Sequence, residues 1–356
     1  MLDSSGEVLD TLFMSHFSIR SKNPAQIKRK EIDQQRFLKF MMDHQPHVVA
    51  LGASNIQCKH LKDGIYEAIF KIVEEHPREF TEGLDTLNVV YGDVVLPSLY
   101  EKSRISQDQL PTQKGLVRRA TALRRYLQNP LAMVATLCGP GREILSLKLH
   151  SLEHFLNPDE RYEAIEQIMV TVTNQVGVDI NLAASHEWMF SPLQFVSGLG
   201  PRKAASLQRA ILRAGRVHTR RELLTTLGAM KRLVFINAAC FLRVRGTGQA
   251  ATSNHVMDPL DDTRIHPESY ELAKKMAEDV YCEDLGQDID DMDEEAQEMA
   301  IEHVKSNPHV LKALDIDEYG ISVEQRIGER KNETLNDIKI ELLQGFQDCP
   351  KSVCNM

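Results

Sequence analysis

Two glycines that flank one apolar residue, Gly198-Leu199-Gly200, constrain the fold of the segment Ser191–Leu224. Apolar residues recur at helical spacing on both sides, so the segment predicts two helices joined by a very short turn. Pro201 suits the first position of the second helix, because its missing N–H would have stayed unpaired there. Free N–H groups at such a helix start favour an anion, and Arg202 and Lys203 add positive charge at the same place.

A second glycine turn follows within the same basic stretch. Gly228 precedes Lys231 and Arg232, which open the apolar run 233–242. Two such turns are typical of a tandem helix-hairpin-helix, a module that holds the nucleic-acid backbone without reading bases. The predicted contacts are Gly198, Leu199, Gly200, Arg202 and Lys203 in the first turn and Gly228, Lys231 and Arg232 in the second. The alternative is that these glycines only make tight turns in a helical core.

Charge is unevenly distributed in a chain whose net charge is −9. Residues 201–245 hold eleven Lys or Arg and one acid, whereas residues 258–302 hold seventeen acids and three bases. A basic block followed by an acidic block predicts two surfaces with different partners. The acidic block is either a solvated helix face or a surface for a basic protein such as a histone. The arginines expected to surround the glycine turns with positive charge are Arg209, Arg213, Arg216, Arg220 and Arg221.

The first half of the chain predicts a different architecture. Apolar runs typical of strands lie at 47–54, 87–96 and 141–152, and helical periods lie at 63–75, 116–127 and 160–177. Strands that alternate with helices indicate an α/β domain with a largely parallel sheet, to about residue 180. The arginines of 116–127 are expected to point outward. Residues 246–264 are rich in turn-forming residues and predict a linker, which leads into the helical segment 266–346.

Several classes of protein are excluded by what the sequence lacks. No run of eighteen apolar residues occurs, so no membrane span is expected, and the N-terminus has neither the basic nor the apolar part of a secretory signal. The six cysteines form no Cys-x-x-Cys pair, which argues against a zinc site or a disulfide framework and favours a reducing compartment. Phosphate-binding loops, nucleophile elbows and dinucleotide fingerprints are missing, so no cofactor or metal is predicted.

An α/β domain invites comparison with nucleases of the ribonuclease H type. Such enzymes hold two metal ions about 4 Å apart with three or four carboxylates on adjacent strand ends. The candidate acids are Asp3, Asp93 and Asp159, and the strand end at Val49–Ser54 carries none. We therefore predict that the chain is not an enzyme. A metal-dependent nuclease or junction resolvase, and a pure protein-interaction module, remain as alternatives.

Four stretches resemble one family over most of their length: residues 174–183, 193–211, 235–245 and 259–280. They are similar to the eukaryotic transcription elongation factors and histone chaperones called suppressor of Ty six, and more distantly to bacterial Tex. The resemblance implies a YqgF or ribonuclease-H-like domain at 1–182, a tandem helix-hairpin-helix at 183–250 and a helical death-like domain at 260–347. It also implies a non-catalytic scaffold in the nucleus that binds DNA, the RNA polymerase II elongation complex and histones.

The sequence departs from this family pattern in four places. The start of the chain, 1–10, resembles the second strand of the ribonuclease-H-like pattern, so the first strand and its acid are expected to be missing. Ser151 follows His150 where Tex-like sequences carry an acid. Cys240 replaces a usual glycine and is expected to disturb close helix packing. The chain also stops where the family continues into an oligonucleotide-binding barrel, which predicts a central fragment or a truncated relative.

Overall fold

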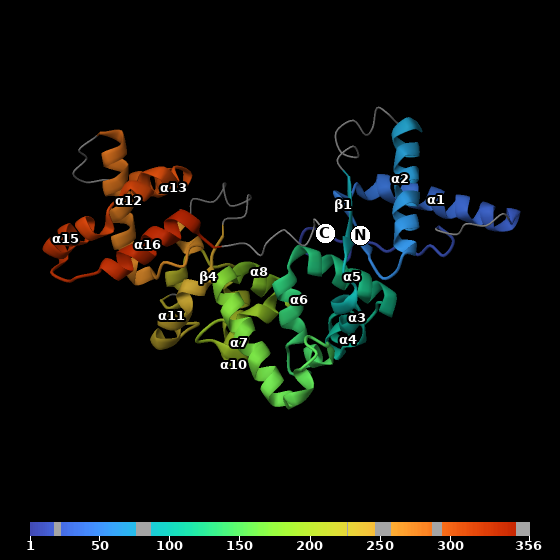
Figure 1. The fold of residues 1–356 in the computed structure, drawn as a ribbon, viewed down its shortest axis with the longest axis horizontal. Helices are drawn as coiled ribbons and strands as arrows, with labels where there is room; N and C mark the ends of the chain where they lie inside the picture. Colours follow the sequence, from blue (N-terminus) through green and yellow to red (C-terminus); the bar gives the residue numbers. More distant parts are fainter. Residues whose placement is uncertain (18–22, 76–86, 226, 246–257, 287–293, 347–356) are drawn as a thin grey trace. The chain divides into compact units, whose positions relative to one another are not determined.

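The computed structural model describes residues 1–17, 23–75, 87–225, 227–245, 258–286 and 294–346, without the side chains of 71–75 and 294–295. The chain forms two units, Met1–Ser151 and Leu152–Cys349 (Figure 1). The described residues confirm that the first unit contains parallel strands and helices and that the second is mainly helical. None of the described helices combines the length with the apolar content that a bilayer span requires.

The described part of the first unit contains two parallel strands and six helices. They are α1 (Pro24–His44), β1 (Val48–Gly52), α2 (Gln57–Glu75), β2 (Asn88–Gly92), α3 (Val95–Lys102), α4 (Arg104–Gln109), α5 (Gly115–Gln128) and α6 (Pro130–Leu137). The register pairs Val48 with Asn88 and Gly52 with Gly92. The predicted strand at 47–54 and the predicted helix at 63–75 are thus confirmed.

Helices α1 and α2 pack on the two strands through one apolar core. Its buried members come from all four elements and include Phe37, Met41, Leu51, Ile65, Ile69 and Val89. Helix α5 approaches the carboxyl end of the strands, where glycines stand. A Cβ added to Gly92 would lie 2.6 Å from Leu123 Cδ1, so the close contact of α5 requires glycine there.

Two strand predictions in this half need correction. The segment 141–152 forms no strand; it contains the 3₁₀ turn Glu143–Ser146, which follows Arg142 in a left-handed conformation. The strand predicted at 87–96 ends at Gly92, where the Asp93 carboxylate accepts the N–H of Val95, the first residue of α3, at 3.1 Å. Apolar residues alone do not distinguish a strand from a short buried helix.

The start of the chain forms a turn at residues 4–6 and docks on α5. Leu2 and Val8 make an antiparallel bridge around it. Arg125 is only 3% exposed, and its Nε donates to the Gly6 carbonyl at 2.9 Å. The prediction that the arginines of this helix all point outward is therefore wrong for Arg125, because the turn needs a donor at that point.

The second unit is helical apart from one short parallel strand pair among its described residues. Its helices are α7 (Pro158–Val176), α8 (Ile180–Ser185), α9 (Glu187–Phe190), α10 (Gly200–Ala214), α11 (Arg232–Ala238), α12 (Tyr270–Leu285), α13 (Glu294–Ser306), α14 (Pro308–Ala313), α15 (Ile316–Ile327) and α16 (Asn332–Gln344). Strands β3 (Val178–Asp179) and β4 (Leu242–Arg243) pair side by side. Residues 178–245, which begin with β3 and include β4, form the hairpin module, which has its own apolar core.

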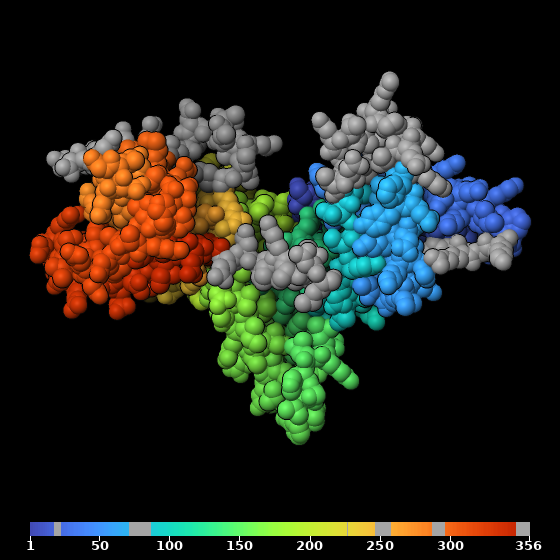
Figure 2. Space-filling view, turned by 45° about the horizontal axis from the view of Figure 1, so that its top comes forward, coloured from blue at the N-terminus to red at the C-terminus, as the bar shows by residue number. Residues whose placement is uncertain are grey.

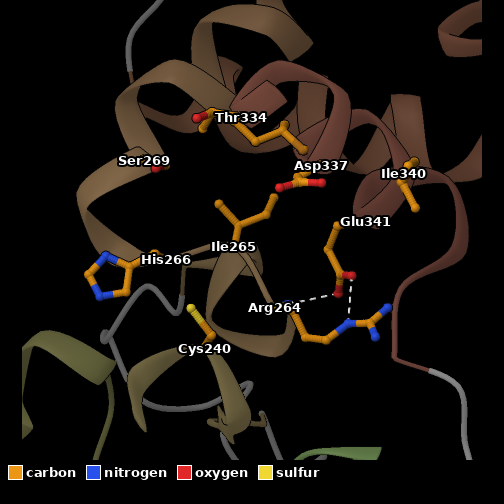
Figure 3. A pocket seen from close by; sticks show the side chains of 10 residues that line it. Cys240, Arg264, Ile265, His266, Ser269, Thr334, Asp337, Ile340 and Glu341 are labelled. Carbon is orange, nitrogen blue, oxygen red and sulfur yellow. Dashed lines mark hydrogen bonds and ion pairs between the residues drawn. The ribbon is translucent and has the colours of Figure 1, made fainter. Parts of the chain in front are cut away.

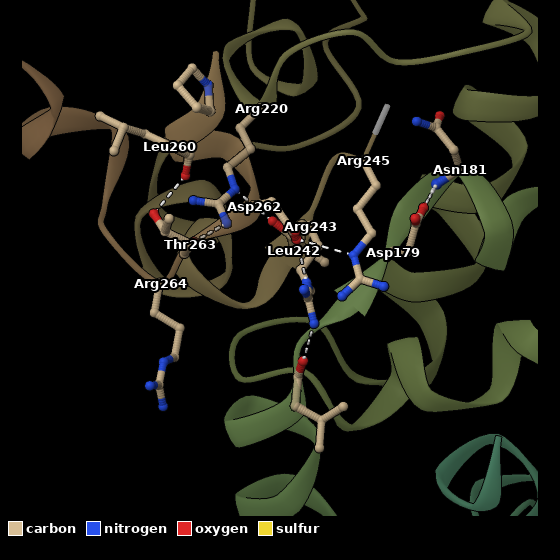
Figure 4. A network of polar contacts seen from close by, with 12 residues as sticks. Asp179, Asn181, Arg220, Leu242, Arg243, Arg245, Leu260, Asp262, Thr263 and Arg264 are labelled. Atoms are coloured by element: carbon tan, nitrogen blue, oxygen red, sulfur yellow. Dashed lines mark hydrogen bonds and ion pairs between the residues drawn. The ribbon is translucent and has the colours of Figure 1, made fainter. Parts of the chain in front are cut away.

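Helices α12 to α16 enclose a separate apolar core and form the helical module, residues 258–346, coloured orange to red in Figure 2. Arg220 joins it to the hairpin module (Figure 4). The Arg220 side chain is fully buried and donates to the Leu242 carbonyl at 2.6 Å and to the Thr263 carbonyl. It also donates to the Ile265 carbonyl at 3.0 Å and to the Tyr270 hydroxyl at 3.1 Å. One guanidinium therefore satisfies acceptors from both modules.

Two neighbouring aspartates complete this junction. Asp261 accepts the Tyr270 hydroxyl at 2.6 Å and the Arg220 N–H at 3.2 Å. Asp262 accepts from Arg243 and, at 3.2 Å, from Arg245. Burial by itself would raise the pKa of Asp262, but these two arginines lower it below its usual range.

Part of the predicted linker 246–264 is therefore a packed structural element. The described part, 258–264, contains the 3₁₀ turn Pro259–Asp262, whose Leu260 is fully buried. Asp258 opens this turn, because its carboxylate accepts the Leu260 N–H at 2.9 Å. Residues 246–257 lie outside the described residues.

Replacement of Arg220 by leucine is expected to lower the free energy of unfolding by about 3–5 kcal/mol, because the buried acceptors lose their donor. Guanidinium denaturation followed by the fluorescence of Trp188, the sole tryptophan and a buried residue of the second unit, measures this change. The control is Arg221→Leu. Arg221 is exposed: its ion pair with Glu271 spans 4.0 Å, and it donates a single hydrogen bond, at 3.3 Å, to the Pro267 carbonyl, so its loss should cost no more than about 1 kcal/mol. Equal effects of the two variants would contradict the structural role of Arg220.

Candidate nucleic-acid interface

The first glycine turn lies between the 3₁₀ helix Ser191–Phe195 and helix α10. Gly198 and Gly200 have φ angles of +86° and +69°, in the left-handed region where side chains are disfavoured. A Cβ at Gly200 would meet nothing within 4 Å. The Gly200 N–H stands at the first position of α10, where no intrahelical acceptor exists. The turn thus presents open backbone at a helix start, as its sequence predicts.

The turn is held in place from two sides. In helix α7, the Asn174 side chain donates to the Ser197 hydroxyl at 2.6 Å and accepts the Ser197 N–H at 3.2 Å. On the other side, a Cβ at Gly198 would lie 2.8 Å from the Asn237 Cβ of helix α11. Gly198 therefore lets the second hairpin pack directly against the first.

The two basic residues predicted to bind phosphate lie on the exposed first turn of α10. Lys203 folds back, and its Nζ donates to the Gly198 carbonyl at 2.8 Å, which places its charge at the glycine turn. Arg202 is exposed and makes no hydrogen bond or ion pair with any described residue. A guanidinium without a protein partner is available for an external anion.

Leu199 has a different place from the rest of the predicted set. Its side chain is 4% exposed and belongs to the core of the hairpin module. Its N–H donates to the Val196 carbonyl at 3.0 Å. Neither group is free to meet a ligand, so Leu199 anchors the turn and does not contact solvent.

The second glycine turn has the same residue types but a different backbone. Gly228 is exposed with a φ angle of +52°. The N–H groups of Ala229 and Met230 both donate to the Leu223 carbonyl, at 3.0 and 3.2 Å. Lys231 and Arg232 are exposed and have no described partner. Anion binding here would depend on these two side chains, since the neighbouring N–H groups are already bonded.

The positive charge around these turns is smaller than the sequence suggests. The prediction that Arg220 adds positive charge around the glycine turns is wrong, because its side chain is buried in the junction between the two modules. Arg216 is half-buried and donates to the Arg245 carbonyl at 3.3 Å. The other predicted field residues, Arg209, Arg213 and Arg221, are exposed. The sequence alone does not show which arginines of such a run are buried hydrogen-bond donors and which are exposed cations.

The carboxylates proposed for a nuclease site have structural uses. Asp3 accepts the N–H groups of Ser5 and Glu7, both at 2.9 Å, and so closes the first turn of the chain. Asp93 accepts the Val95 N–H at the start of α3, and Asp159 lies in the first turn of α7. Within the residues that the structure describes, no group of three or more His, Cys, Asp or Glu side chains could hold a metal ion.

Cys240 is accommodated because its side chain faces a cavity. The cavity has a volume of about 420 Å³ and also borders Arg264, His266 and Glu341 (Figure 3). Burial raises the pKa of the Cys240 thiol, which keeps it protonated. The thiol thus borders open space, and the disturbance of helix packing at this position stays a prediction.

Three family models match successive parts of the chain. Residues 1–138 match the Holliday-junction resolvase-like domain of SPT6. Residues 142–245 match a helix-hairpin-helix motif, and residues 258–349 match an HHH domain. The model matched at 142–245 includes both glycine turns.

Curated relatives match almost the whole chain. It is 61% identical to the transcription elongation factor SPT6 homolog of Arabidopsis thaliana over 98% of its length, which is 21% of that protein. It is 56% identical to the SPT6-like transcription elongation factor of the same plant, with 98% of this chain and 26% of that protein covered. It is 32% identical to transcription elongation factor SPT6 of Candida albicans, over 94% of this chain and 24% of the relative. The chain thus spans about a fifth to a quarter of these relatives.

Alanine at Gly198 is expected to destabilise the second unit more than alanine at Gly200. Both changes strain a left-handed residue by about 1–2 kcal/mol, and only Gly198→Ala adds a clash, with Asn237, for a total of about 2–4 kcal/mol. Denaturation curves followed through Trp188 give the two values. If Gly200→Ala were the more damaging change, the packing of α11 on the first turn would be wrong.

Proposed function

We propose that this chain, which is a homologue of the SPT6 transcription elongation factors, holds nucleic acid by its sugar–phosphate backbone during transcription. The observation that carries the proposal is the turn Gly198–Gly200, with Lys203 bonded to it and beside it Arg202, which has no partner among the described residues. Open backbone, a helix start and two cations form one anion-binding surface. Such a surface contacts phosphates and does not distinguish bases.

The second turn would supply a weaker contact of the same kind. Lys231 and Arg232 act there through their side chains, and Gly228 keeps the turn compact. Two contacts on one rigid module bind more tightly than either alone, because the second forms within the same complex. Packing of α11 against Gly198 supports this rigidity.

The wider role follows from homology. We propose a non-catalytic scaffold in the nucleus that supports RNA polymerase II transcription through chromatin, with the polymerase elongation complex and histones as protein partners. The structural uses of Asp3 and Asp93 support a non-catalytic role over a metal-dependent nuclease. A pure protein-interaction module is the other alternative, and nucleic-acid binding distinguishes it from the proposed scaffold.

The same proposal assigns a task to each part of the chain. A YqgF or ribonuclease-H-like domain at 1–182 forms the N-terminal part of the scaffold, and the tandem helix-hairpin-helix at 183–250 holds nucleic acid. A death-like helical domain at 260–347 supports the hairpins through Arg220. Helices α12 to α16 around one apolar core are compatible with this last assignment.

The full chain is expected to bind duplex DNA weakly, with an affinity that falls steeply between about 50 and 200 mM salt if six or more phosphates are contacted. Arg202→Glu combined with Lys203→Glu should lower the affinity at least about tenfold and reduce the salt slope, because two phosphate contacts are lost. Fluorescence anisotropy with a labelled duplex measures both. The full chain is used because a piece limited to 183–250 lacks three of the acceptors of Arg220.

Lys28→Glu combined with Arg29→Glu is the matched control. These exposed residues of α1 are also adjacent, so the net charge changes by the same amount. The control should bind almost as the parent does. Equal losses in both variants would mean that overall charge drives binding, and no binding by the parent would favour a protein-interaction module.

Neither Mg²⁺ nor Mn²⁺ is expected to induce cleavage of duplex, branched or RNA–DNA hybrid substrates, because the candidate carboxylates do not gather around a metal. Gel analysis of labelled substrates after prolonged incubation tests this. Cleavage that depends on metal and disappears in Asp93→Asn would revive the nuclease alternative.

A further inference from the structure

A groove in the helical module lies away from both glycine turns. Helices α12, α14 and α15 line it, and its volume is about 720 Å³. Val280, Val310 and Leu314 form an apolar floor. These side chains belong to or pack against the core of the module, so the floor is part of a rigid structure.

Acidic side chains surround this floor. The carboxylates that line the groove are Glu283, Asp284, Asp315 and Glu318, and the described lining contains no Lys or Arg. His309 is the one basic side chain there. Acidic groups around an apolar floor create a region of negative potential next to a surface that favours burial.

Two of these carboxylates differ from other acids of the same module. Asp279 pairs with Lys275 and Arg326, and Asp258 pairs with Lys274. By contrast, the side chains of Glu283 and Glu318 are exposed and have no hydrogen bond or ion pair with the described residues. Their charge is therefore not neutralised within the described part of the chain.

We propose that this groove binds a basic, amphipathic protein segment. Apolar side chains of that segment lie on the floor formed by Val280, Val310 and Leu314. Its Lys or Arg side chains pair with Glu283 and Glu318 at the rim. An amphipathic helix laid in an apolar groove is a common mode of peptide recognition, and the acidic rim selects the basic members of that class.

The chemistry of the groove decides between classes of partner. A nucleic acid would bring phosphates toward the carboxylates of Glu283 and Glu318, which have no cationic partner among the described residues, and is repelled. An acidic or uncharged peptide could pack apolar side chains on the floor of the groove but would form no ion pairs with the carboxylates at its rim. A basic segment with an apolar face satisfies both parts, and this proposal does not depend on the nucleic-acid grip of the hairpin module.

The test measures binding of a fluorescent peptide to the full chain. The probe is a helical peptide of about sixteen residues with leucines on one face and lysines on the other. A matched peptide carries glutamates in place of the lysines. The lysine peptide should bind at least about tenfold more tightly than the glutamate peptide, by fluorescence anisotropy at about 150 mM salt.

Two variants separate the rim from the floor. Glu283→Lys combined with Glu318→Lys should weaken binding of the lysine peptide at least about tenfold. Ala313, which lines the groove and is exposed, becomes tryptophan in a second variant that fills the space without changing the charge. Ala313→Trp should weaken binding to a similar extent, and its exposed position should leave the fold intact.

Glu324→Lys combined with Glu333→Lys is the control, because both residues are exposed in the same module and neither lines the groove. Retained binding in this control, together with losses in both groove variants, supports the proposal. Loss in the control, or retained binding in Ala313→Trp, would mean general attraction to an acidic surface and would overturn it. Equal binding of the two peptides would also overturn it.

Discussion

The buried guanidinium of Arg220 is the constraint on which the second unit depends. An arginine without hydrogen-bond acceptors is very unfavourable in a protein interior, so its burial requires a complete set of partners. Leu242 supplies one acceptor from the hairpin module, and Thr263, Ile265 and Tyr270 supply the others from the helical module. The two modules therefore share one polar centre. Neither can satisfy that centre alone, and the position of the glycine turns relative to helix α12 is fixed as a result.

Two of the stretches that carry the family resemblance, 235–245 and 259–280, meet around this centre. Residues 235–245 provide β4 and its arginines, and residues 259–280 provide Asp261, Asp262 and Tyr270. Residues 174–183 provide Asn174, which holds the first turn. The same stretch includes Gly177, where a Cβ would lie 2.6 Å from the Phe346 ring. Their sequence pattern thus reflects the way in which the two modules are joined.

Local geometry could be predicted from the sequence where one residue type dictates the backbone. The turn at Gly198–Gly200 and the ends of α7 and α10 follow from glycine and proline, whose backbone preferences are independent of distant residues. The partners of a long side chain could not be predicted in this way. Arg125 and Arg220 occur in stretches rich in arginine, and the groups that bury them lie far away along the chain. The periodicity of apolar residues does not show which distant groups will accept hydrogen bonds from these two arginines.

In the candidate nucleic-acid site, too, the contacts of individual side chains could be predicted only in part. Arg202 and Lys203 could be assigned to the exposed start of α10, because a helix start after a glycine turn has a defined geometry. Leu199 could not be separated from them, since a turn residue between two glycines is either exposed or anchored by the core. Asn174 was missed because an asparagine in a long helix carries no sign of the serine that it holds.

The junction also determines when the hairpin module can fold. Arg220 and Tyr270 are 50 positions apart, and β3 pairs with β4 across the whole module. Contacts of such long range form late, because both partners must first be present. During synthesis, the helices of the hairpins can form early, but Arg220 has no complete set of acceptors until Tyr270 has left the ribosome. A nascent chain that pauses before that point exposes a hairpin module whose central charge is not yet compensated, and completion of the hairpin module is thereby coupled to synthesis of the first turn of α12.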